Sequence, residues 1–147
     1  MTTETLRRGI RIGRTGRVLL GLWCLFLVAG FSTAAMLSPD PRGFGTHQRL
    51  GLPPCTIRVL SGVRCPTCGM TTSFANFVRG RFAASARANA AGFCLAWVCA
   101  VQLPWCVVSL RRGELWGVAQ PDRWLLSILG GLLALSLLQW AVWMWLE

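Results

Sequence analysis

Two cysteines separated by two residues, Cys65 and Cys68, are the residues of this chain whose types and spacing most suggest chemistry. They lie in the run Cys-Pro-Thr-Cys-Gly, in which the proline stiffens a turn and the glycine permits a positive φ. A turn of this kind can hold a metal ion through its thiolates, form or exchange a disulfide, or simply shape a loop. The choice among the three depends on which residues the fold brings to the turn.

A metal site needs more ligands than this turn supplies. Tetrahedral zinc takes four nitrogen or sulfur ligands, and the turn offers two. Cys55 and His47, which is the only histidine, lie in the same polar segment and would complete a set of three cysteines and one histidine. The candidate metal site therefore consists of these two residues together with Cys65 and Cys68, and zinc is the candidate ion.

Thiol–disulfide exchange is the alternative chemistry for Cys65 and Cys68, and it would make the protein a membrane oxidoreductase. A CxxC pair at the start of a helix has a lowered thiolate pKa, because the helix dipole favours the anion. Cys55 would then act as a resolving or partner thiol. Gly69 weakens this interpretation, since it falls in the first helical turn that must position Cys68. An oxidising compartment favours disulfide chemistry, and a reducing one favours zinc.

A structural role is the third interpretation: the turn begins a helix, and the protein works by binding other membrane proteins. Other catalytic groups are scarce. The chain has five carboxylates, none of which lies in an apolar segment or beside another. This argues against paired-carboxylate hydrolysis and against most proton relays within a membrane. The sequence therefore favours a non-enzymatic membrane component over an enzyme.

Three windows without charged residues must position the cysteine turn. They cover residues 18–39, 88–110 and 124–146. About 20 apolar residues span the hydrocarbon core of a bilayer, so each window is long enough. The sequence predicts an all-α integral membrane protein with three transmembrane helices over about 18–37, 88–110 and 124–146. The four cysteines inside these windows are expected to pack as small hydrophobes: Cys24, Cys94, Cys99 and Cys106.

The chain divides into a basic tail over residues 1–17, expected to be disordered, and a single membrane domain over residues 18–147. Within that domain, residues 38–87 form the cysteine segment. Apolar residues at helical spacing from Met70 to Val78 predict a short amphipathic helix in the membrane interface after the turn. A second long helix is expected to begin near Arg81 and to run on through the next apolar window.

Two faces of the long helices carry small or polar residues that suit close contacts. Gly92, Ala96 and Ala100 recur at four-residue spacing, so a neighbouring helix is expected to approach there. Gly130-Gly131 and Gln139 in the last helix are candidates for contacts with other membrane proteins or for self-association.

The positive charge points to lipid and not to nucleic acid. The formal charge is +10, and all fifteen basic residues are arginines lying outside the three apolar windows. Phosphate head groups of the bilayer are the expected anionic neighbours. Near the ends of the spans, eight arginines lie on the side of the tail and five on the side of the cysteine segment. The positive-inside rule therefore predicts a cytoplasmic N-terminus and an extracytoplasmic cysteine turn.

Residues 65–74, then Arg79-Gly80 and a stretch of small residues up to Asn89, resemble the bacterial membrane family known as domain of unknown function 2752. The resemblance covers about residues 50–110. It rests on a Cys-Pro-x-Cys-Gly-x-Thr signature matched by Cys65, Pro66, Cys68, Gly69 and Thr71. Ala90 stands where the family has proline, and Thr72 where many members have arginine. The resemblance implies a multi-pass protein of the bacterial inner membrane, and it supplies no activity.

Overall fold

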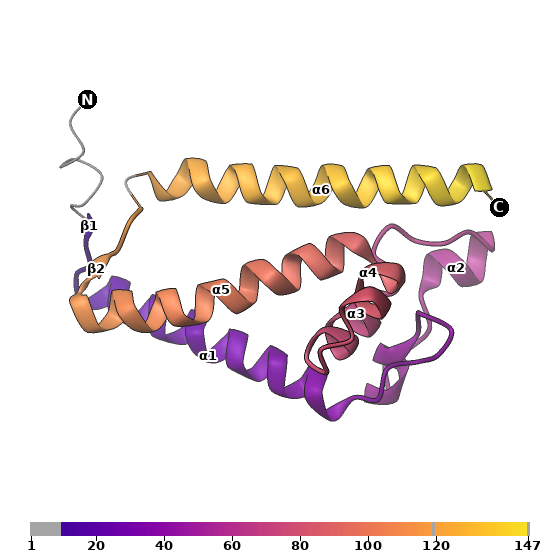
Figure 1. The fold of residues 1–147 in the computed structure, drawn as a ribbon, viewed down its shortest axis with the longest axis horizontal. Helices are drawn as coiled ribbons and strands as arrows, with labels where there is room; N and C mark the ends of the chain where they lie inside the picture. The colour runs from indigo at the N-terminus through magenta and orange to yellow at the C-terminus, as the bar shows by residue number, and fades with distance from the viewer. Residues whose placement is uncertain (1–9, 119, 147) are drawn as a thin grey trace.

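Three long helices dominate the structure, a computed structural model that describes residues 10–118 and 120–146 (Figure 1). They are α1 (Arg14–Met36), α5 (Ala90–Arg112) and α6 (Pro121–Leu146). Each is long and apolar enough to cross a membrane, so the prediction of an all-α protein with three spans is confirmed. α5 contacts both α1 and α6, whereas the described residues show no contact between α1 and α6 themselves.

The helices extend beyond the apolar windows at their charged ends. α1 begins at Arg14 instead of at residue 18, because long arginine side chains can reach the head-group layer from a helical backbone. Residues Ile10–Arg11 form a short strand, β1, which pairs antiparallel with β2 (Glu114–Leu115). Residues 10–11 and 14–17 of the expected tail therefore have regular structure, and residues 1–9 of it lie outside the described residues.

Four short helices gather at one end of the bundle, where α1 ends, α5 begins and the C-terminus of α6 lies (Figure 1). They are η1 (Thr46–Leu50), α2 (Thr56–Ser61), α3 (Met70–Phe77) and α4 (Phe82–Ala88). Together with the loops between them, these helices make up the cysteine segment. We call this end of the bundle the cysteine end.

The short helix after the turn is present as α3, but its polar side is buried. α3 contacts α1, α4 and α5, so it packs inside the cysteine end with its Thr72, Ser73 and Asn76 side chains buried. Ser73 is fully buried, and its hydroxyl donates to the carbonyl oxygen of Asn89 at 3.1 Å. The hydroxyl of Ser85 donates in turn to the carbonyl oxygen of Ser73 at 2.8 Å. These bonds let small polar side chains replace apolar ones in the contact between helices.

The single helix expected from Arg81 onward is broken at Asn89. α4 ends at Ala88 and α5 begins at Ala90, because Asn89 adopts an extended backbone with φ −163° and ψ 114°. The side-chain oxygen of Asn89 accepts a hydrogen bond from the N–H of Gly92 at 2.7 Å, which makes Asn89 the N-cap of α5. The break lets α4 fold back against α3 instead of continuing into the span.

The expected close approach along α5 is confirmed at its first two small residues. A Cβ atom at Gly92 would lie 3.1 Å from the Cβ of Ser73 on α3, so a larger residue there would push the two helices apart by a few tenths of an ångström. Ala96, one turn further along, is fully buried.

Arg79 ties the cysteine segment to the end of α1. Its guanidinium donates to the carbonyl oxygens of Ala34 at 3.2 Å and of Ala35 at 2.8 Å. These carbonyls belong to the last turn of α1 and have no partner further along the helix. A positive charge at this end also interacts favourably with the helix dipole.

Candidate metal centre

The three cysteines of the polar segment come together. The sulfur atoms of Cys55, Cys65 and Cys68 all lie within 4.8 Å of one another. Among the described residues, this is the one group of three or more His, Cys, Asp or Glu side chains with such spacing. Zinc–sulfur bonds of about 2.3 Å in a tetrahedral site place sulfurs about 3.8 Å apart. The cluster therefore needs only a small contraction to match a metal site.

Local turns bring the sulfurs together. Cys55 immediately precedes α2, and Gly62 ends that helix in a left-handed conformation with φ 72°, so the chain reverses toward Cys65. The N–H of Cys68 donates to the carbonyl oxygen of Cys65 at 2.9 Å and closes the second turn. The sulfur of Cys65 also lies 3.1 Å from the hydroxyl of Thr67. Two tight reversals of the chain thus place the three sulfurs close together.

Gly69 is required where the turn meets α4. Its φ is +86°, in the left-handed region that side chains disfavour. A Cβ atom there would also meet the carbonyl oxygens of Ala88 and of Gly43, the latter at 2.7 Å. The glycine of the Cys-Pro-Thr-Cys-Gly run therefore serves both the turn and its packing against two backbone segments.

Asn89 holds the cysteine turn as well as capping α5. Its side-chain N–H group donates to the carbonyl oxygens of Pro66 at 3.2 Å and of Cys68 at 3.0 Å. The residue is fully buried. Sequence reasoning did not place Asn89 at the site, and the one available signal was a capping residue at the start of an apolar window.

α6 contributes three further hydrogen bonds to this region. The indole N–H of Trp140 donates to the carbonyl oxygen of Arg64 at 2.7 Å, and the hydroxyl of Ser136 donates to that of Pro66 at 3.2 Å. The side-chain oxygen of Gln139 accepts from the N–H of Ala90 at 2.9 Å. Gln139, a sequence candidate for contacts with other proteins, therefore bonds within its own chain.

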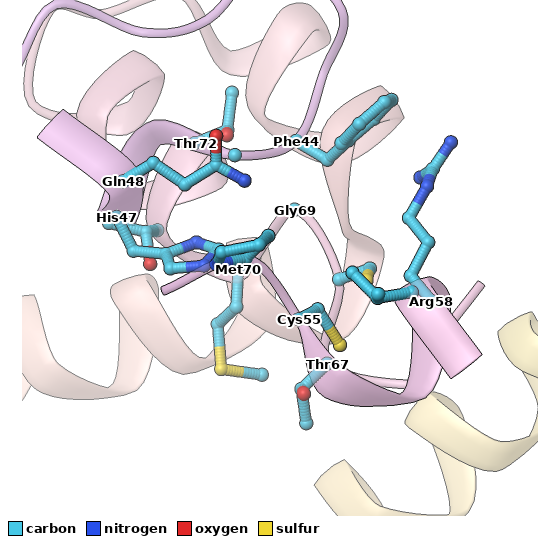
Figure 2. A pocket seen from close by; sticks show the side chains of 14 residues that line it. Phe44, His47, Gln48, Cys55, Arg58, Thr67, Gly69, Met70 and Thr72 are labelled. Atoms are coloured by element: carbon cyan, nitrogen blue, oxygen red, sulfur yellow. The ribbon is translucent and has the colours of Figure 1, made fainter. Parts of the chain in front are cut away.

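A cavity of about 420 Å³ opens beside the cluster. Cys55 and Cys68 line it, whereas Cys65 is buried and does not. Figure 2 shows His47, Gln48 and Met70 on one side of this space and Cys55 on the other. His47 thus lines the same cavity from η1, but its nitrogens are not part of the group within 4.8 Å. The structure brings together three of the four predicted ligands and leaves the fourth across the cavity.

The electrostatics of the two cavity-lining thiols differ in direction. The backbone N–H of Arg58, at the start of α2, interacts with Cys55 and lowers the pKa of its thiol. Burial raises the pKa of the Cys68 thiol. In the metal-free protein, Cys55 therefore becomes a thiolate at lower pH than Cys68 does.

Comparison with known proteins identifies a family over the part of the chain that contains this cluster. Residues 55–103 match the family described as "Protein of unknown function (DUF2752)", which confirms the family expected from the sequence. The matched range contains the three cysteines, Gly69 and Asn89. No curated protein and no solved structure matches the chain.

Proposed function

We propose that this chain, whose residues 55–103 match the DUF2752 family, is a multi-pass membrane protein that binds a zinc ion through Cys55, Cys65 and Cys68. The observation that carries the proposal is the convergence of three sulfurs from two separate turns within 4.8 Å. Thiolates are soft ligands that favour zinc, copper(I) and iron–sulfur clusters over magnesium or calcium. The ion would fix the cysteine segment at the end of the bundle, in a protein that acts as a membrane component and not as an enzyme.

The fourth ligand is proposed to come from the cavity side. Cys55 and Cys68 face the cavity, so a ligand there reaches an ion held between the sulfurs. His47 lines that cavity, and an imidazole nitrogen is a normal zinc ligand. Its coordination requires η1 to shift toward the cluster, so His47 is expected to contribute less to affinity than the cysteines.

Metal analysis of the purified full-length protein tests the proposal. After loading with zinc and removal of free ion, we expect about one zinc per chain, because the three thiolates form a single site. Cys55→Ser, Cys65→Ser and Cys68→Ser should each fall below half an equivalent. Cys24→Ser and Cys94→Ser remove the same group from the spans and should leave the zinc content unchanged.

The same preparations distinguish how many sulfurs bind. With cobalt(II) in place of zinc, three thiolates give strong sulfur-to-cobalt charge-transfer absorption, which each cysteine variant of the cluster should weaken. His47→Ala should retain the metal with lower affinity, whereas Gln48→Ala, from the same cavity wall, should behave as wild type. Less than half an equivalent of zinc or cobalt in the wild-type protein contradicts the proposal.

Thiol–disulfide exchange is the second candidate, and the opposite pKa directions of Cys55 and Cys68 support it. In this function Cys65 and Cys68 would be oxidised to a disulfide by exchange with the disulfide of a partner protein, which is reduced. A Cys55 thiolate would then attack one sulfur of the Cys65–Cys68 disulfide, form a new disulfide with it and release the other sulfur as a thiolate. Trapping thiols with N-ethylmaleimide in cells, followed by mass analysis, separates the two functions. A disulfide among the three cysteines favours exchange, and three thiols that react only after chelation favour the metal.

The location is proposed to be the bacterial inner membrane, with a cytoplasmic N-terminus and the cysteine end outside. Three spans support opposite sides for the two termini, and the arginine distribution supports the orientation. Gly130 and Gly131 have no other atoms within 4 Å of an added Cβ, which supports contacts between α6 and lipid or a neighbouring membrane protein. An impermeant thiol reagent applied to intact cells with a chelator should label Cys55, and labelling only after lysis contradicts this orientation.

A further inference from the structure

A second, smaller cavity of about 50 Å³ lies next to the cysteine cluster, and it is lined by arginines. Cys68 borders both cavities. Four guanidinium groups from separate parts of the cysteine segment line the smaller one: Arg42, Arg58, Arg64 and Arg87. We call this space the arginine cavity.

Aromatic rings hold three of these guanidinium groups in place. The guanidinium carbon of Arg58 lies 3.7 Å from the centroid of the Phe44 ring, and that of Arg42 lies 5.2 Å from the same ring. The guanidinium carbon of Arg64 lies 5.4 Å from the ring centroid of Trp143 on α6. Stacking on a ring restricts the orientation of the guanidinium plane.

Among the described residues, the lining of the arginine cavity contains four arginines and no carboxylate. Asp40, which is not part of the lining, pairs with Arg42 at 2.8 Å. The Nη1 atom of Arg58 is buried and has no hydrogen-bond partner among the described residues. A buried donor of a charged group without an acceptor is costly, so this atom points to an acceptor that the described residues do not provide.

We propose that the arginine cavity binds a phosphate group. Guanidinium forks match the oxygens of phosphate, and several arginines around one small space suit a compact anionic acceptor with several oxygens. The space exceeds the roughly 10–15 Å³ that one water molecule needs, so a small oxyanion is accommodated.

The position of the cavity indicates where the phosphate comes from. Trp143 lies near the end of α6, and tryptophans at span ends sit at the level of the lipid head groups. The phosphate of an anionic phospholipid and a free phosphate in solution share the required chemistry. Binding would join α2, α4, α6 and the loop at Phe44 through one ligand, independently of any metal at the cysteines.

A lipid arm and a soluble arm test the proposal on the full-length protein. In the lipid arm, native mass spectrometry of protein taken from nanodiscs counts retained phosphatidylglycerol against phosphatidylcholine. In the soluble arm, protein in nanodiscs of phosphatidylcholine alone is titrated calorimetrically with inorganic phosphate. Retained phosphatidylglycerol assigns the site to a head group, and saturable binding of inorganic phosphate assigns it to a soluble ligand.

Matched variants separate a defined site from a general positive surface. Arg58→Gln should weaken binding about ten-fold or more in the arm that shows it, because a charge-assisted hydrogen bond is lost. Arg49→Gln makes the same charge change on the same end of the molecule, outside the arginine cavity, and should change binding less than about two-fold. Arg87→Gln, whose exposed side chain lies on α4, serves where Arg58→Gln does not elute as a folded, monodisperse species. No saturable binding in either arm, or an equal loss in Arg49→Gln, overturns the proposal.

Discussion

The two ends of this bundle are built by different means. At the cysteine end, Ser, Thr and Asn side chains connect the short helices and the cysteine turn to α5 and α6, and the guanidinium of Arg79 bonds to the end of α1. Thr46 and Thr72 are both buried, and their hydroxyls lie 2.7 Å apart. At the opposite end, which we call the strand end, backbone pairing between β1 and β2 and a bond from the Trp105 indole N–H to the carbonyl oxygen of Trp116 at 2.7 Å join the helices.

The difference between the two ends shows where side chains must be held at defined positions. Backbone pairing of two residues per strand joins helices without fixing side chains in a particular place. A cluster of three sulfurs needs turns held at defined positions, and side-chain bonds from α5 and α6 to the cysteine turn supply that. We therefore expect substitutions at the cysteine end to cost more stability, and more metal, than comparable ones at the strand end.

The largest expected effect is that of Asn89→Ala. It removes one hydrogen bond to each of two turn carbonyls and the cap of α5, so we expect a loss of roughly 3–5 kcal/mol in the free energy of unfolding. Thermal or denaturant unfolding in detergent, followed by circular dichroism, measures it. Asn76→Ala is the matched control, because the buried Asn76 side chain donates a single bond, to the carbonyl oxygen of Thr72 at 3.0 Å. Equal losses in the two variants contradict the central role of Asn89.

Gly69→Ala should have the next largest effect, a loss of roughly 2–4 kcal/mol in the free energy of unfolding. Alanine disfavours the left-handed backbone at this position, and its Cβ would also meet two carbonyl oxygens. Gly62→Ala separates the two causes. Gly62 has a similar φ of +72°, but an added Cβ there has nothing within 4 Å, so we expect only about 1 kcal/mol. Zinc content should fall in Gly69→Ala more than in Gly62→Ala. Indistinguishable unfolding curves for the two variants mean that the turn is not packed against Ala88 and Gly43.

A substitution at the strand end should cost little. Trp105→Phe keeps the ring in α5 and removes the bond to the carbonyl oxygen of Trp116, so we expect about 0.5–1 kcal/mol. Zinc content and the unfolding of the cysteine end should stay the same. If this variant loses metal as Asn89→Ala does, the two ends are not independent, and the contrast between them does not hold.

The smallest effect is a difference within the cysteine end itself. In metal-free protein, the rate of alkylation by iodoacetamide should rise with pH at a lower midpoint for Cys55 than for Cys68. The thiolate is the reacting species. Because the pKa of Cys55 is lowered, its thiolate forms below the ordinary thiol value of 9.0. Because the pKa of Cys68 is raised, its thiolate forms above that value. Peptide mass analysis across a pH series reports each midpoint. A lower midpoint for Cys68 reverses the assignment.

The spans were predictable because hydropathy and charge alone define them. The three windows without charge coincide with α1, α5 and α6 to within a few residues at each end. All three residues of the sulfur cluster were also among the predicted ligands. Their meeting was not predictable, because it depends on the reversal at Gly62, where no regular period marks the sequence.

The positions that hold the site were harder to predict. Asn89 sits at the start of an apolar window, where a sequence pattern cannot distinguish a continuing helix from a capped break. Ser136 and Trp140 lie in a span whose composition explains them equally well as packing or interface residues. Their partners are backbone carbonyls of the turn. Every residue has a backbone carbonyl, so the sequence does not show which carbonyls accept these bonds.

Asn89 also links the chemistry of the turn to the bilayer. Its side-chain oxygen accepts a hydrogen bond from the first turn of α5, and its side-chain nitrogen donates to two carbonyl oxygens of the cysteine turn. A span adjusts its tilt and depth to the thickness of the surrounding hydrocarbon. Movement of α5 therefore pulls on the carbonyls of Pro66 and Cys68, and the separation of the three sulfurs becomes sensitive to the thickness of the lipid around the protein.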